Sequence, residues 1–137
     1  MIKTIGLISL MVILLTILGG AIACKSNPSS TADESAIRAY ADPATEMTLQ
    51  GMSENNLAKY TQYGNSEFKA AVTQEMLDEA ATQMSDQLGA YVSKEFLKTE
   101  EQDGYTIVHY KAKYSKGEVG IRMVFDKNHL IAGQWFE

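Results

Sequence analysis

Hydrophobic residues follow three different patterns along the chain, and each pattern predicts a different kind of segment. Residues 5–18 form an uncharged and mostly aliphatic run near the amino end. Between about residues 31 and 89, apolar residues recur every three or four positions, as they do on one face of a helix. From residue 91 onward, apolar and polar residues alternate, as in a strand with one buried face. This order predicts one domain in which helices precede strands.

Capping and breaking signals divide the first part of the helical region. Thr31 and Glu34 have capping-box spacing and predict a short helix that starts there. That helix is expected to end near Tyr40, because Pro43 disfavours helical geometry at Asp42. Asp42 is then expected to cap a second helix, with Pro43 at its first position and Gly51 weakening its end.

The rest of the helical region divides into three further predicted segments. Ser53 is expected to cap a short helix that carries Leu57, and residues 68–72 form a brief helical turn or an irregular link. Thr73 caps the clearest helix, which Gly89 ends. The apolar positions of that helix recur at helical spacing: Met76, Leu77, Ala80, Ala81, Met84 and Leu88.

Four strands are predicted from the alternating region. They cover about residues 91–99, 105–114, 118–126 and 130–136. The turn Asp103-Gly104 is the strongest hairpin signal, because both residues tolerate the positive φ that a two-residue turn needs. The second and third strands each carry one apolar face, made of Val108, Tyr110, Ala112 and Tyr114, and of Val119, Ile121, Met123 and Phe125. Short turns between successive strands predict an antiparallel meander with helices on one side, which is an α+β fold.

Two segments resemble a known protein family. They are FKAAVTQEMLDEAATQMSDQLGAY (68–91) and EEQDGYTIVHYKAKYSKGEVGIRMVFDKNHLIAG (100–133). With the spacing between them, they are similar to the family called domain of unknown function 3887, over about residues 44–136. The order of elements also resembles the cystatin-like roll of the nuclear-transport-factor-two-like superfamily. The resemblance implies amino-terminal helices packed on a curled four-stranded sheet in a protein that is often secreted or lipid-anchored, and it supplies no catalytic motif.

The amino-terminal segment has the organisation of a prokaryotic lipoprotein signal peptide. Lys3 precedes the aliphatic run, and small residues at Ala21 and Ala23 lead into Cys24, the only cysteine of the chain. This arrangement resembles the lipobox, and the resemblance implies cleavage after Ala23 and diacylation of Cys24, for example with palmitate. A thioether requires a nucleophilic sulfur, which only cysteine supplies.

An uncleaved transmembrane anchor is the alternative to a lipid anchor. Residues 4–23 are uncharged and just long enough to span a bilayer. Both interpretations place the protein at the cell membrane with its domain on the extracytoplasmic side. The predicted division is therefore residues 1–23 as signal peptide, 24–31 as lipidated cysteine and flexible tether, and 32–137 as a single domain.

Charge and residue content narrow the chemistry of the domain. Residues 24–137 hold 11 basic and 17 acidic residues, which disfavours binding to nucleic acid. A lone cysteine cannot form an internal disulfide. The two histidines lack the spacing of a metal site, and the sequence contains neither a glycine-rich phosphate loop nor a G-x-S-x-G elbow. We therefore expect no metal and no cofactor.

Three residues in the predicted strands are candidates for ligand binding: Arg122, His109 and Tyr110. Arg122 interrupts the apolar third strand on the face opposite Ile121, where it either meets an anionic ligand or simply faces solvent. His109 alternates with Val108 and either contacts a ligand, transfers a proton or faces solvent. Tyr110 belongs either to a binding surface or to the packing of the sheet.

The expected function is that of a non-enzymatic, lipid-anchored extracytoplasmic binding or accessory module. Its partner would be a small ligand, a peptide or an envelope protein. The alternative is a small isomerase- or hydrolase-like enzyme that uses a carboxylate and a tyrosine in a pocket. An enzyme needs acid, base and orienting groups together, and the sequence shows no such set. A sheet-mediated homodimer is a third alternative.

Overall fold

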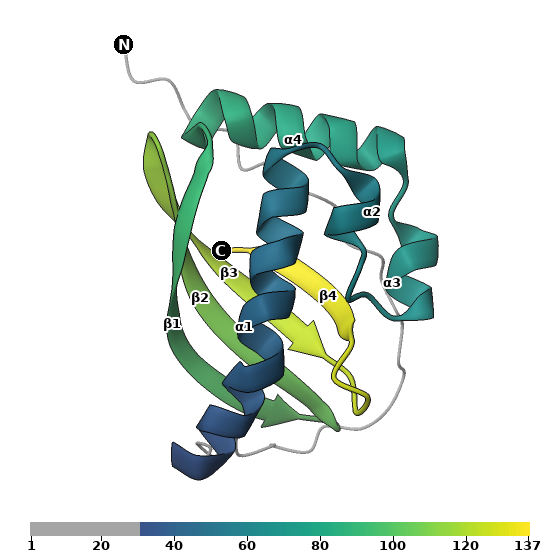
Figure 1. Ribbon diagram of the computed structural model, residues 1–137, viewed down its shortest axis with the longest axis vertical. Helices are drawn as coiled ribbons and strands as arrows, with labels where there is room; N and C mark the ends of the chain where they lie inside the picture. The colour runs from purple at the N-terminus through teal and green to yellow at the C-terminus, as the bar shows by residue number, and fades with distance from the viewer. Residues whose placement is uncertain (1–30) are drawn as a thin grey trace, which may run out of the picture.

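The computed structural model describes residues 31–137, in which helices are followed by a four-stranded sheet (Figure 1). The helices are α1 (Thr31–Ser53), α2 (Leu57–Tyr60), α3 (Ser66–Ala71) and α4 (Gln74–Leu88). The strands are β1 (Tyr91–Gln102), β2 (Tyr105–Tyr114), β3 (Gly117–Phe125) and β4 (Ile131–Phe136). All neighbouring strands are antiparallel and the spatial order is β1-β2-β3-β4. The predicted α+β fold with an antiparallel meander is confirmed.

The hairpin between β1 and β2 turns where the sequence predicts it. Asp103 and Gly104 have φ values of 54° and 80°, and these positive values suit a two-residue hairpin turn. Pairing continues up to Gln102 opposite Tyr105, so β1 runs farther than the predicted end at residue 99. Strand β1 extends to Gln102 because the turn consists of only Asp103 and Gly104.

One face of the sheet is apolar and packs beneath the helices. In Figure 1, α1 lies across this face, and α4 crosses near the end of the sheet from which β1 starts. The apolar stripes predicted for β2 and β3 are buried here, except that Val119 is only partly buried. The opposite face, which we call the outer face, carries His109, Arg122 and Trp135, paired across neighbouring strands.

Helix α1 is continuous over 23 residues, so the predicted break at Asp42 and Pro43 is wrong. A proline inside a helix removes a backbone hydrogen bond and costs about 3 kcal/mol. Burial offsets this cost, because apolar positions before and after Pro43 enter the same core. These positions are Ile37, Ala41, Ala44, Leu49 and Met52. Pro43 itself is exposed, and Asp42 bonds to side chains instead of capping a new helix.

The two short helices are capped by asparagines, so the prediction that Ser53 caps the first of them is wrong. Ser53 is the last residue of α1. Asn56 caps α2 and Asn65 caps α3, each by accepting a hydrogen bond from the backbone N–H three residues further on. The start of the first short helix is therefore set by Asn56, immediately before Leu57.

Helix α4 has the predicted ends. The Thr73 side chain accepts a hydrogen bond from the backbone N–H of Met76, and Gly89 ends the helix with a φ of 81°. Leu77 and Ala80 are buried against the core, whereas Met76 is 45 % exposed. The helical periodicity therefore located the helix correctly but included one residue that faces solvent.

Candidate functional site

A cluster of charged and aromatic side chains crosses the outer face of the sheet, with members from β1, β2, β3 and the end of β4. We call it the outer-face cluster, and it consists of Glu100, His109, Arg122, Trp135 and Glu137. Antiparallel pairing brings these residues together, since His109 lies opposite Arg122 and Arg122 lies opposite Trp135. The cluster therefore depends on the register of the whole sheet.

His109 lies at the centre of the outer-face cluster, between two carboxylates. Its Nε2 is 3.4 Å from Glu100 Oε2, and its Nδ1 is 3.4 Å from Glu137 Oε2. Only 13 % of the His109 side chain is exposed, so the residue is more enclosed than a simple solvent-facing position. A neutral imidazole has one N–H to donate, whereas an imidazolium has one for each of the two carboxylates.

Arg122 is held over the ring of Trp135. The guanidinium carbon is 4.7 Å from the ring centroid, and Nε is 3.9 Å from Glu137 Oε1. The Trp135 ring covers Gly133, at a place where any side chain would collide with it. This stacking fixes the direction of a side chain that still exposes 38 % of its surface.

The charges at the β1 side of the cluster are also paired. Lys98 Nζ donates to Glu100 Oε1 at 2.7 Å. This hydrogen bond is the main cause that lowers the pKa of Glu100 below its ordinary value, and His109 adds to the effect. Glu100 is therefore ionised at neutral pH and presents a fixed negative charge beside the imidazole.

Tyr110, the third candidate from the sequence, lies on the opposite face and belongs to a separate polar seam between α1 and the sheet. Its hydroxyl donates to Asp42 Oδ1 at 2.8 Å, and Arg38 Nε donates to Asp42 Oδ2 at 3.1 Å. Burial and the hydrogen bond to Asp42 raise the pKa of Tyr110 above its ordinary value. The structure therefore brings His109 and Arg122 together and separates Tyr110 from them.

The same seam contains a second pair of tyrosine and carboxylate. Tyr91 donates its hydroxyl hydrogen to Glu46 Oε2 at 2.8 Å, and Lys94 Nζ is 3.2 Å from the same oxygen. Burial by itself would raise the pKa of Glu46, but hydrogen bonds from Tyr91, Gln50 and Lys94 bring it below the ordinary value. Each tyrosine of the seam is thus engaged by a carboxylate of α1.

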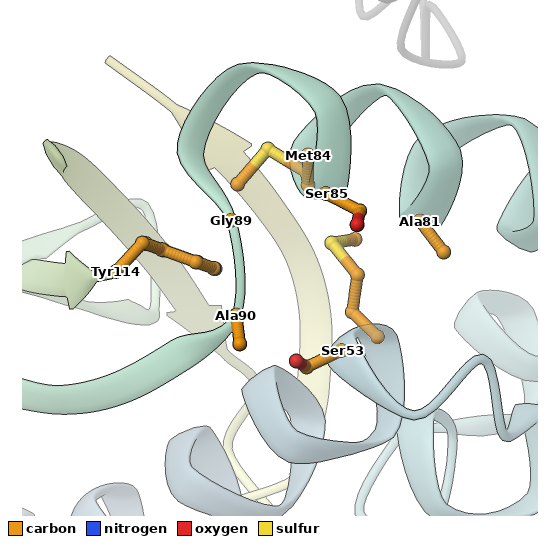
Figure 2. A pocket seen from close by; sticks show the side chains of 8 residues that line it. Ser53, Ala81, Met84, Ser85, Gly89, Ala90 and Tyr114 are labelled. Carbon is orange, nitrogen blue, oxygen red and sulfur yellow. The ribbon is translucent and has the colours of Figure 1, made fainter. Parts of the chain in front are cut away.

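A small cavity lies where the carboxyl ends of α1 and α4 approach the sheet (Figure 2). Its volume is about 80 Å³. It is lined by Met52, Ser53, Ala81, Met84, Ser85, Gly89, Ala90 and Tyr114. Neither tyrosine–carboxylate pair of the seam lines this cavity. Among residues 31–137, no group of three or more histidine, cysteine or acidic side chains is placed to hold a metal ion.

The sequence identified two members of the outer-face cluster and missed three. Glu100, Trp135 and Glu137 carry no motif, and they join the cluster only through strand pairing. Ala23 and Cys24, the predicted cleavage and lipidation residues, lie outside the described residues. Within residues 31–137, none of the helices combines the length and apolar character that a bilayer crossing requires.

Comparison with known families assigns the chain to a class defined by sequence. The family of proteins of unknown function DUF3887 matches residues 46–133, which is more than half of the chain. The chain belongs to this family. The match begins inside α1 and ends within β4, so it includes the first three strands and the residues that line the cavity, whereas Trp135 and Glu137 lie beyond it. No curated protein and no solved structure matches the chain.

Proposed function

We propose that this DUF3887 protein is a lipid-anchored extracytoplasmic module that binds a protein partner through the outer face of its sheet. The observation that supports this proposal is the outer-face cluster. The Arg122 guanidinium lies over the Trp135 ring, and the His109 imidazole lies between two carboxylates, 3.4 Å from each, before any partner is present. Side chains held in this way lose little conformational freedom on binding.

A protein partner fits this surface better than a small molecule does. Small-molecule sites are concave, whereas the outer-face cluster lies across the strands and contributes no residue to the cavity between the helices and the sheet. Tryptophan and arginine are the residue types that most often dominate the energy of protein interfaces. The alternating acids and bases around them would give a partner both orientation and selectivity.

The enzyme alternative has partial support, because tyrosines and carboxylates do meet in the polar seam. Those groups are hydrogen-bonded to one another, and none of them lines the cavity shown in Figure 2. Binding therefore remains the better proposal. A second copy of this chain is one form that the partner could take, and kinship with the nuclear-transport-factor-two-like superfamily remains a prediction from the resemblance.

The lipid anchor is tested by the mass of the mature protein. We expect protein extracted from membranes to lack residues 1–23 and to carry acyl chains on Cys24, because two or more chains are needed for stable anchoring. Cys24→Ala should accumulate as the full-length precursor. A wild-type chain that keeps residues 1–23 and has no added mass would contradict the lipid anchor and favour the transmembrane alternative.

The outer-face partner is tested by photo-crosslinking in the membrane-anchored full chain. A photoreactive residue in place of Lys111, which is exposed on the outer face, should give a discrete adduct. The same residue in place of Gln83, exposed on α4, is the matched control and should give none. Arg122→Ala should lower the adduct yield by roughly tenfold or more, since a central arginine often contributes 2 kcal/mol to an interface.

The adduct mass distinguishes the kinds of partner, since twice the mass of the chain indicates a second copy. Arg122→Ala should also leave the midpoint of thermal unfolding within a few degrees of wild type, which shows that the fold is intact. A Lys111 adduct that persists unchanged in Arg122→Ala would contradict a role for the outer-face cluster.

A further inference from the structure

One of the residues that line the cavity in Figure 2, Tyr114, has a buried hydroxyl that no described residue satisfies. Tyr114 is only 3 % exposed, and its hydroxyl has no hydrogen-bond partner among the described residues. Figure 2 shows its side chain reaching from the end of β2 toward the segment of Gly89 and Ala90. A buried hydroxyl without a partner is costly, so an acceptor that reached it from the cavity would relieve that cost.

The lining of the cavity limits the charge of what can bind there. None of the eight lining residues carries a charged side chain. Burial raises the pKa of Tyr114 to about 12, so its phenol is neutral and able to donate at physiological pH. A charged ligand would lose its hydration here without gaining a counter-ion.

The remaining lining limits the shape and surface of the ligand. Met52 and Met84 supply flexible apolar side chains that adapt to an aliphatic group. Ser53, Ser85 and Ala90 are exposed and form the rim through which the cavity is reached. A volume of about 80 Å³ admits only a few heavy atoms.

We propose that this cavity binds a small uncharged aliphatic group with a hydrogen-bond-accepting oxygen, which accepts from the Tyr114 hydroxyl while the methionines enclose the aliphatic part. The group belongs either to a free small molecule or to the end of a larger one. The site is on the helix side of the sheet, distinct from the outer-face cluster, so it does not rest on the proposed partner.

Isobutyramide is a suitable probe, because it combines a short branched chain with a neutral carbonyl. In the full ¹⁵N-labelled chain, we expect saturable shifts of the Gly89 and Ala90 amide signals, with a dissociation constant in about the millimolar range for so few atoms. Isobutyrate and isobutylammonium have the same chain but carry a charge, and each should bind at least about tenfold more weakly.

Two pairs of variants locate the site. Tyr114→Phe removes only the donor and should weaken isobutyramide binding about tenfold, whereas Tyr110→Phe removes a hydroxyl that already bonds to Asp42 and should not. Ser85→Leu should block the rim and abolish the shifts, whereas Gln83→Leu, on an exposed position of α4, should leave them unchanged.

Several outcomes would overturn the proposal. They are the absence of saturable shifts, equal affinity in Tyr114→Phe, equal affinity for the charged probes, and a cavity that contains only ordered water at saturating isobutyramide. A larger molecule is indicated if an N-alkyl isobutyramide with a long polar extension binds as well as the parent compound. Loss of binding by the extended amide alone would indicate a free small molecule.

Discussion

Phe125→Ala is expected to lower the free energy of unfolding by about 3–5 kcal/mol, the range for removing a fully buried phenylalanine. Phe125 has no exposed surface and lies on the apolar face of β3. Its ring and the Tyr40 ring of α1 form an edge-to-face contact with a centroid distance of 5.3 Å. Phe125 also pairs with Ile131 of β4. The substitution would therefore leave a cavity between α1 and the sheet.

Chemical denaturation followed by circular dichroism measures this change, with Val124→Ala as the matched control. Val124 is the neighbouring residue and points to the outer face, where it is only partly buried, so its truncation should cost about 1 kcal/mol or less. If Phe125→Ala does not fold, Phe125→Leu should fold with a smaller loss. Equal effects of the Phe125→Ala and Val124→Ala variants would contradict the assignment of the two faces.

The assignment of the sheet faces was predictable from sequence because it depends on local information. A period of two places alternate residues on opposite faces, and the Asp103-Gly104 turn sets the register of the first hairpin. In the next hairpin Tyr114 pairs with Gly117, and counting five residues along each strand from that pair brings His109 opposite Arg122. That pair of the outer-face cluster could therefore be predicted once the short turn was recognised.

The rest of the cluster was not predictable in this way, because irregular pairing interrupts the count. The register of β3 with β4 shifts between Val124 and Phe125, which displaces Trp135 from the position that simple counting gives. Strand β1 contains two further shifts, and they leave Val92 57 % and Leu97 49 % exposed at the edge of the sheet. Bulges of this kind depend on the tertiary packing of a strand and have no reliable sequence signal.

The error in α1 has a different physical origin. Helix propensities correctly assign an energetic cost to Pro43. They do not include the apolar side chains that α1 buries before and after this residue. Leu49 and Ala41 are both almost completely buried, so ending the helix between them would expose core surface. Tertiary burial outweighs the local preference, as it commonly does for helices in proteins.

Gly51→Ala is expected to lower the free energy of unfolding by about 3 kcal/mol, although the change adds only one methyl group. A Cβ at Gly51 would collide with the backbone of α2, coming within 2.6 Å of Tyr60 Cα and 2.9 Å of Lys59 C. Backbone atoms cannot rotate away as a side chain can. The helices would have to separate, which would also strain the hydrogen bond from Asn56 N to Gly51 O.

The matched control for this prediction is Gly120→Ala, because it adds the same methyl group at a position with space for it. The three atoms nearest to a Cβ at Gly120 belong to Glu137 and lie at 3.4 Å or more, which is ordinary contact. We therefore expect Gly120→Ala to stay within about 0.5 kcal/mol of wild type in the same denaturation experiment. A similarly small effect of Gly51→Ala would mean that α1 and α2 do not approach so closely in solution. A large effect would show that the contact between α1 and α2 requires a residue without a Cβ at Gly51, in the last turn of α1.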